Sequence, residues 1–105
     1  MMRIYDVMIQ VIVGLRPVVR KVERFDGDLV RQTRRAANSV ALNLAEGSGS
    51  SGGVRTQRYR TALGSARETW ACLDVAEANG YVESVDAELR TKLSQVIATL
   101  IKVTR

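Results

Sequence analysis

The sequence predicts an all-α protein, an antiparallel up-down-up-down four-helix bundle, from three observations. Apolar residues recur at three- and four-residue steps in four separate segments, the period of one helix face. The chain contains one proline, and four of its eight glycines lie within residues 47–53, so little interrupts long helices. No segment alternates apolar and polar residues as a half-buried strand does. We therefore expect one domain over residues 1–105, with helices at about 3–24, 28–46, 54–79 and 84–104.

The first predicted helix is apolar on more than one side. Its main stripe consists of Ile4, Met8, Val11, Ile12, Leu15, Val18, Val19 and Val22. Val7 and Val13 lie outside this stripe, so the first half of the helix is apolar nearly all round. A helix with two apolar faces needs two partners, which favours self-association. Pro17 removes one backbone hydrogen bond and predicts a kink.

The second predicted helix follows the break "FDGD" (25–28), with Asp28 as its expected N-cap, and ends at Gly47. Small side chains on its inner face would let a neighbouring helix approach closely. The residues expected to face inward are Leu29, Thr33, Ala36, Ala37, Val40 and Leu44.

The third and fourth helices are separated by the dipeptide Asn79-Gly80, which tolerates the left-handed geometry of a helix C-cap. We expect the fourth helix to open at Ser84. Cys72 is expected to be a small buried hydrophobic residue. The expected inward stripes are Tyr59, Leu63, Ala66, Trp70 and Leu73 in the third helix, and Leu89, Leu93, Val96, Ile97, Leu100 and Ile101 in the fourth.

Composition argues against most catalytic and metal-binding classes. Without histidine, the chain has no Ser–His or Cys–His nucleophile pair and no Glu-x-x-His di-iron motif. One cysteine forms neither a disulfide framework nor a thiolate metal cluster. No apolar run reaches the roughly 18 residues of a membrane span, and the run at residues 7–15 has no small-residue cleavage site after it. We therefore expect a cytoplasmic protein that is not an enzyme and has no catalytic residue, cofactor, metal or membrane partner.

The end of the second helix, followed by "GSGSSGG" (47–53), could suggest a phosphate-binding loop. Such a loop normally follows a strand and ends in lysine and a hydroxyl residue, whereas here a helix precedes it and lysine is absent. A carboxylate at a helix C-terminus is opposed by the helix dipole, so Glu46 should have a hydrogen-bond or arginine partner. We interpret Asn43 and Glu46 as a buried polar clasp. An approach of Glu46 to Glu68 would supply two ligands, too few for a hard-cation site.

Positive charge is concentrated in the first two-thirds of the chain. The net charge is +5, with twelve cations and six anions in residues 1–70 but four and five in residues 71–105. Such a surface is typical of proteins that meet polyanions, and the arginine fork pairs two phosphate oxygens. A solvated face, or pairing with acids across a subunit interface, is the alternative. The candidate nucleic-acid-binding residues are Arg16, Arg20, Lys21, Arg31, Arg34, Arg35, Arg55, Arg58 and Arg60.

The stretch "RRAANSVALNLAEGSGS" (34–50) resembles the signature of bacterial four-helix-bundle proteins first found in intervening sequences of large-subunit ribosomal RNA genes. Two positions depart from that signature: Ala41 replaces a frequent proline, and Asn38 replaces a usually apolar residue. The glycine-serine loop is also longer than is typical. The matching residues are Arg34, Arg35, Ala36, Ser39, Asn43, Leu44, Ala45, Glu46 and Gly47, then Ala62, Gly64, Ser65 and Glu68, then Gly80 and Tyr81.

The resemblance implies a small cytosolic bundle without catalytic machinery, of which several members form five-fold rings. A related branch, the accessory variability determinant of diversity-generating retroelements, is basic, binds nucleic acid and partners a reverse transcriptase. Two functions therefore stay open. One is a homo-oligomeric, pentameric binder of RNA or DNA. The other is a protein-interaction scaffold or accessory subunit, for example of a reverse transcriptase, that does not itself bind nucleic acid.

Overall fold

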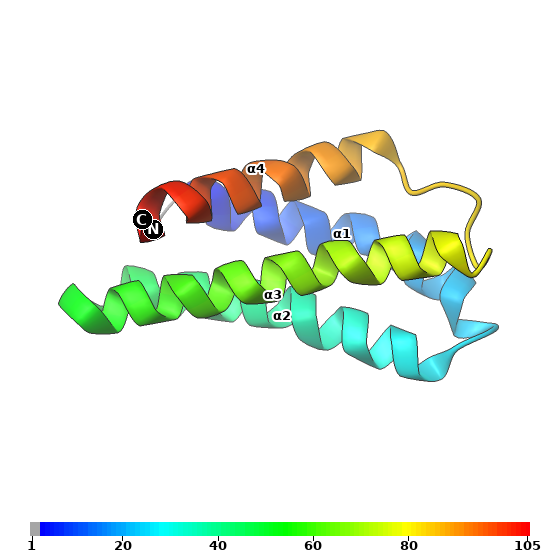
Figure 1. The fold of residues 1–105 in the computed structure, drawn as a ribbon, viewed down its shortest axis with the longest axis horizontal. Helices are drawn as coiled ribbons and strands as arrows, with labels where there is room; N and C mark the ends of the chain where they lie inside the picture. Colours follow the sequence, from blue (N-terminus) through cyan, green and yellow to red (C-terminus); the bar gives the residue numbers. More distant parts are fainter. Residues whose placement is uncertain (1–2) are drawn as a thin grey trace.

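The computed structural model describes residues 3–105 as four helices: α1 (Arg3–Glu23), α2 (Gly27–Ser48), α3 (Gly52–Ala78) and α4 (Ala87–Thr104). The described residues contain no strand. Helix α1 packs on α2 and α4, and α3 packs on the same two helices. Successive helices run in opposite directions (Figure 1), so the structure is the predicted up-down-up-down bundle, 43 × 24 × 20 Å in extent.

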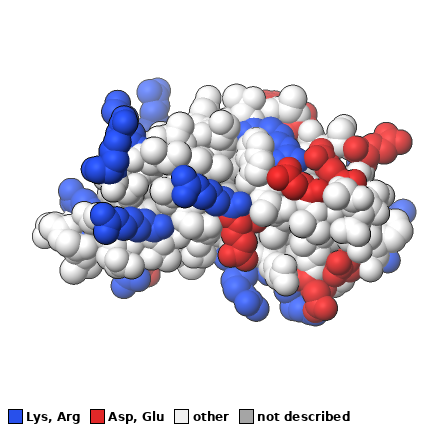
Figure 2. Space-filling model, viewed as in Figure 1, with Lys and Arg blue, Asp and Glu red and all other residues white. Residues whose placement is uncertain are grey.

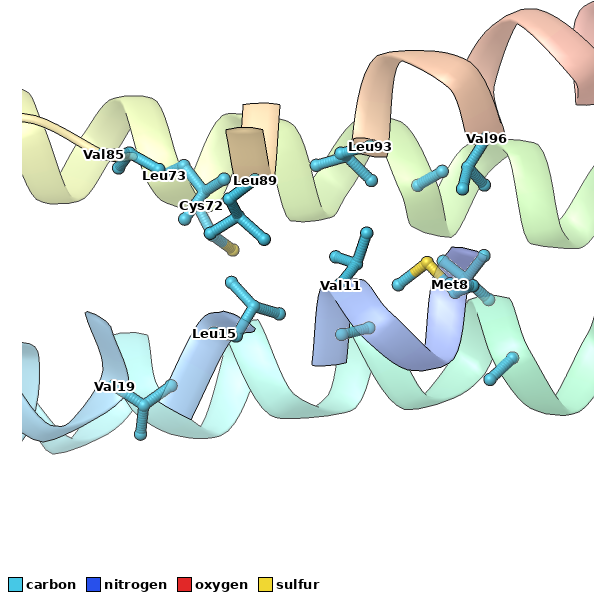
Figure 3. Packing of buried hydrophobic residues seen from close by; sticks show 14 of the residues in the cluster. Met8, Val11, Leu15, Val19, Cys72, Leu73, Val85, Leu89, Leu93 and Val96 are labelled. Atoms are coloured by element: carbon cyan, nitrogen blue, oxygen red, sulfur yellow. The ribbon is translucent and has the colours of Figure 1, made fainter. Parts of the chain in front are cut away.

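The core runs along the bundle axis and draws side chains from all four helices (Figure 3). In α1 and α2, burial follows the predicted stripes closely, and α1 continues through Pro17 without interruption. Only Ile12 and Val18 of the α1 stripe are half-buried. In α4 the stripe is narrower than predicted, since Ile97 is half-buried and Ile101 is exposed.

Helices α2 and α3 form the most extensive pairing in the bundle. Their buried faces carry alanine where other helices carry large aliphatic residues, and small side chains let two helix backbones approach closely. These buried alanines are Ala36, Ala37 and Ala41 on α2 and Ala62, Ala66 and Ala76 on α3.

The buried face of α3 differs from the predicted stripe. Leu63 and Trp70 are only half-buried, whereas Ala62 and Thr69 are fully buried. Tyr59, Ala66 and Leu73 of the predicted stripe are buried, so the stripe was correct in part and small residues take the places expected for Leu63 and Trp70. Trp70 lies instead beneath Arg90, whose guanidinium carbon is 4.5 Å from the ring centroid, a cation–π contact.

Cys72 is buried in the core as predicted. Burial raises the pKa of its thiol, because the charged thiolate is disfavoured away from water. The negative charge of Glu68 acts in the same direction, and the neighbouring Thr33 hydroxyl acts against both. The thiol is therefore kept in its neutral, unreactive form.

Two helix starts differ from those predicted. The N-cap of α2 is Asp26, whose carboxylate accepts a hydrogen bond from the Leu29 backbone N–H at 2.9 Å; Asp28 lies in the first turn and pairs with Arg31. Helix α4 begins at Ala87 rather than at Ser84. Its N-cap is Asp86, whose carboxylate accepts a hydrogen bond from the Leu89 backbone N–H at 3.3 Å.

The α3–α4 connection begins with the predicted left-handed turn and is then held at two points. Gly80 has φ of +75°, and the Tyr81 N–H donates to the Ala76 carbonyl at 3.0 Å, which closes a Schellman motif. The Tyr81 ring stacks on Phe25 at 5.2 Å between centroids, and its hydroxyl donates to Asp26 at 3.3 Å. Desolvation first, and the charge of Asp26 second, raise the pKa of Tyr81.

Glu77 is the second residue that holds the α3–α4 connection in place. Its carboxylate accepts hydrogen bonds from the Val85 backbone N–H and from the Arg90 guanidinium, both at 2.8 Å. Arg90 also pairs with Asp74 at 3.0 Å. The Val85 hydrogen bond, followed by the charge of Arg90, lowers the pKa of Glu77 below that of an ordinary glutamate.

We predict that Glu77 makes the stability of the bundle pH-dependent in the acid range. Because the pKa of Glu77 is lower in the folded state, its stabilisation is fully present above the unfolded value of about 4.3 and is lost as pH falls through the folded value. The Glu77→Gln variant should therefore be less stable at pH 7 and lose less stability on acidification. Urea unfolding at several pH values between about 7 and 3 measures both effects.

The matched control is Glu83→Gln, because Glu83 is an exposed carboxylate in the same connection. That variant should keep the wild-type stability and pH profile. Superimposable profiles for Glu77→Gln and wild type would contradict the role assigned to Glu77.

Candidate nucleic-acid interface

All nine predicted cations are exposed on the surface. Two of them are engaged by acids: Arg31 pairs with Asp28, and the Arg58 guanidinium lies 3.0 Å from the Glu46 carboxylate. Within residues 3–105 the other seven make no ion pair with an acidic side chain. Most of the positive charge predicted to form the interface is thus left without a direct acidic partner.

Five of these nine cations fall into two separate contact sets. Arg16, Arg20 and Arg34 line one groove between α1 and α2. Arg55 and Arg58 lie at the α2–α3 connection, where they contact Gly47 and Glu46 respectively. At 1.5 Å per residue, thirteen residues of α2 separate Arg34 from Gly47 by about 20 Å. Lys21, Arg31, Arg35 and Arg60 belong to neither contact set.

The groove between α1 and α2, which we call the arginine groove, has a volume of about 360 Å³. Its floor is formed by Leu15 and Val19 of α1 with Thr33 and Ala37 of α2, all buried. The hollow exists because α2 presents short side chains at Thr33 and Ala37. The complete lining is Ile12, Leu15, Arg16, Val19, Arg20, Thr33, Arg34, Ala37 and Asn38, and it contains no acidic residue.

The opposite side of the molecule has a different charge distribution. Figure 2 shows the face bearing α3 and α4, where acidic side chains gather toward the end with the α3–α4 connection and basic ones toward the other end. Asp74, Glu77, Glu83, Asp86 and Glu88 belong to that connection or the helix turns beside it. These five acids do not line the arginine groove.

At the α2–α3 connection, Gly47 is required by a close approach of Tyr59. A Cβ atom at Gly47 would lie 2.7 Å from Cδ1 of the Tyr59 ring, a separation that real Cβ atoms do not tolerate. The Gly47 carbonyl accepts a hydrogen bond from Nε of Arg55 at 3.2 Å, which satisfies a carbonyl of the last turn of α2. Gly64, which lies in the second matched element, has open space around it.

The buried clasp predicted for Asn43 and Glu46 is wrong in its burial, and the two side chains do not share a partner. The Glu46 side chain is 54% exposed, and its partner is Arg58, which confirms only that it pairs with an arginine. Asn43 turns away from the helix end and donates to the Ser39 carbonyl at 2.9 Å and to its hydroxyl at 3.2 Å. Both side chains lie in the last turns of α2, but Asn43 contacts Ser39 of the same helix and Glu46 contacts Arg58 of α3.

A further polar contact between α2 and α3, which the sequence reasoning missed, joins Ser39 to Ser65. The Ser65 hydroxyl donates to the Ser39 hydroxyl at 2.8 Å, and Asn43 donates to the same oxygen. The sequence did point to these two serines, because both belong to the segments that resemble the family signature. Periodicity does not reveal which polar residues of two helices meet.

Glu68 is exposed on α3 and makes no ion pair with a residue of the described chain. Among residues 3–105, no three side chains of histidine, cysteine, aspartate or glutamate gather in a metal-binding arrangement. In the same part of the chain, none of the helices has the length and apolar character needed to cross a membrane.

Comparison with protein families identifies one match. A family model described as 23S rRNA-intervening sequence protein matches residues 4–102, which spans all four helices. Comparison with curated proteins finds no match, and comparison with solved structures finds none either. The family match agrees with the resemblance seen in residues 34–50, and it covers both the arginine groove and the α2–α3 connection.

We predict that Gly47→Ala destabilises the bundle by about 1–3 kcal/mol, the usual cost of overpacking, because the new methyl group meets the Tyr59 ring. Gly64→Ala is the matched control. It is also a helical glycine, but it has no neighbour within 4 Å of the added Cβ. It should stabilise the protein by about 0.5–1 kcal/mol, since alanine is the better helix former. Thermal unfolding of both variants tests the assignment, and equal effects would contradict it.

Proposed function

Since the chain belongs to the 23S rRNA-intervening sequence protein family, we propose that it is a non-enzymatic helical-bundle protein that binds the phosphate backbone of RNA or DNA. The observation that carries the proposal is the set of exposed cations without acidic partners, above all the three arginines of the arginine groove. The family name, which refers to ribosomal RNA, favours RNA as the polyanion.

The charge distribution of the chain supports binding of a phosphate backbone more than it supports a catalytic function. Guanidinium groups pair two phosphate oxygens at once, and contacts of this kind carry affinity without reading sequence. The chain has no histidine, and the described acids do not converge on a common site. A cytoplasmic setting belongs to the same proposal, because a chain with a single buried cysteine does not depend on disulfides.

Homo-oligomerisation is the second part of the proposal, and the resemblance favours a pentamer. Ile9 and Val13 of α1 are exposed, with 55% of Val13 open to solvent. Both line a second groove of about 400 Å³ between α1 and α4, beside Asp86 and Glu88. This mixed apolar and acidic surface is suited to a protein partner. It also favours the alternative function, a scaffold or accessory subunit, for example of a reverse transcriptase, that acts through protein contacts alone.

Replacing the three groove arginines by glutamine should weaken nucleic-acid binding and its salt dependence. The variant Arg16→Gln/Arg20→Gln/Arg34→Gln keeps the aliphatic stems that cover the floor but loses three charges. If each arginine neutralises one phosphate, the slope of log affinity against log salt should fall by about 2 on single strands and about 3 on duplex DNA. Filter binding to structured RNA and duplex DNA, titrated over about 50–200 mM salt, measures this.

The charge-matched control is Arg3→Gln/Lys102→Gln/Arg105→Gln, which removes three exposed cations at the opposite end of α1 and at the end of α4. Its salt slope should stay near that of wild type. If wild-type protein binds neither ligand at low salt, backbone binding is excluded and the scaffold function is favoured.

Val13→Lys should disrupt self-association without unfolding the bundle, because the side chain is exposed and a lysine places a charge in the apolar contact. Native mass spectrometry and light scattering measure the assembly. Leu42→Lys, at another exposed apolar position, on α2, is the control and should leave the assembly intact. A monomeric wild-type protein would contradict this part of the proposal.

A further inference from the structure

We propose that the arginine groove holds an unpaired nucleobase together with its flanking phosphates, so that the protein prefers single-stranded nucleic acid, or single-stranded loops, to duplex. This inference rests on the proposed function, since it names the part of the nucleic acid that the basic surface takes. It adds a requirement that phosphate binding alone does not have: a base must leave its stack and enter the groove.

The rim of the groove supplies the phosphate contacts. Arg16 and Arg20 are four residues apart and so lie one above the other on α1, while Arg34 faces them from α2. None of the three pairs with an acidic side chain of residues 3–105. A nucleotide entering between them would meet guanidinium groups on both sides, and guanidinium planes also stack on bases.

The floor of the groove is suited to a base rather than to a phosphate. The half-buried Ile12 and the small exposed parts of Leu15, Val19 and Ala37 give the groove aliphatic surface, and contact with a hydrated phosphate gives such surface no stabilisation. The Thr33 hydroxyl donates to the Leu29 carbonyl at 2.7 Å, so this polar group of the floor is already satisfied. A base has an apolar face that this floor can cover. In a duplex that face is hidden by stacking, so only an unpaired base can reach the floor.

Asn38 gives the rim a group that can recognise the edge of a base. It is exposed, it lines the groove, and its side chain makes no hydrogen bond within residues 3–105. A side-chain amide offers two donors and an acceptor, and asparagine can form two hydrogen bonds with one base edge.

The length of the groove favours a nucleotide over a helical peptide. Its lining spans Ile12–Arg20 on α1 and Thr33–Asn38 on α2, which is about 8–12 Å along the axis at 1.5 Å per residue. A twelve-residue helix would be about 18 Å long. The volume of about 360 Å³ lies at the small end of ligand sites, which run from roughly 300 to 1,000 Å³.

The test compares three fluorescently labelled ligands with equal numbers of phosphates: single-stranded oligoadenylate, an abasic strand and a duplex. Fluorescence anisotropy at one low salt concentration should show oligoadenylate binding about tenfold more tightly than either of the others, the size expected for one base contact. Equal affinity for all three ligands, or a preference for the duplex, would overturn the inference and leave backbone binding standing. Absence of binding to every ligand would overturn both.

Two pairs of variants locate the effect in the groove. Asn38→Leu should lower affinity for oligoadenylate severalfold and leave the abasic strand unchanged, whereas Gln32→Leu, an exposed change on α2 outside the groove, should alter neither. Arg34→Gln should weaken oligoadenylate binding more than Arg35→Gln, although both remove one exposed charge from α2. Identical effects within each pair would place the binding site elsewhere. Circular dichroism confirms that each variant is folded.

Discussion

The close packing of α2 against α3 through small side chains is the constraint on which the rest of the surface depends. Alanines at the interface and the bare backbone of Gly47 beneath Tyr59 let the two helices approach without large residues between them. The inner face of α2 is therefore small, and its long side chains, among them Arg34 and Arg35, are left on the outside. Small side chains also occur on the side of α2 that faces α1. There Thr33 and Ala37 leave the arginine groove between the two helices.

Charge follows this packing. Arginines line the groove between α1 and α2, whereas the acids of the C-terminal third lie around the α3–α4 connection. Several of these acids stabilise that connection. Asp86 caps a helix, Glu77 holds the connection through Val85, and Asp74 and Glu77 share Arg90. Because these acids are engaged at the connection and none lines the arginine groove, the separation of charge persists in the folded state. Such a separation orients an approaching polyanion before any contact forms.

Periodicity was enough to predict the four helices and the faces of α1 and α2, because large aliphatic residues mark those faces without ambiguity. In α3 it was right for Tyr59, Ala66 and Leu73 but not for Leu63 and Trp70, because Ala62 and Thr69 complete the buried face and Trp70 is covered by Arg90 from a distant segment. Two aspartates lie at the start of α2, Asp26 before it and Asp28 in its first turn, and only the extended backbone of Asp26 decides which one caps the helix. Exposure of the arginines followed from helix geometry. Helix geometry alone does not predict that some arginines line a groove and others lie at the distant α2–α3 connection. That arrangement depends on how α1 packs against α2 and on where α3 begins.

The proposed recognition divides affinity and selectivity between different side chains. Contacts of Arg16, Arg20 and Arg34 with phosphate would supply affinity that salt weakens, because counterions compete for the same charge. A base on the aliphatic floor beside Asn38 would supply selectivity that salt leaves largely intact, because burial and neutral hydrogen bonds are not screened in the same way. Raising the salt concentration should therefore reduce binding of all ligands and weaken duplex binding most, because the salt slope per phosphate is steeper for duplex DNA, while the ratio of oligoadenylate to abasic-strand affinity stays nearly constant. The proposed discrimination depends on the shape of the groove, whose lining residues all lie on the packed helices α1 and α2 rather than in a loop.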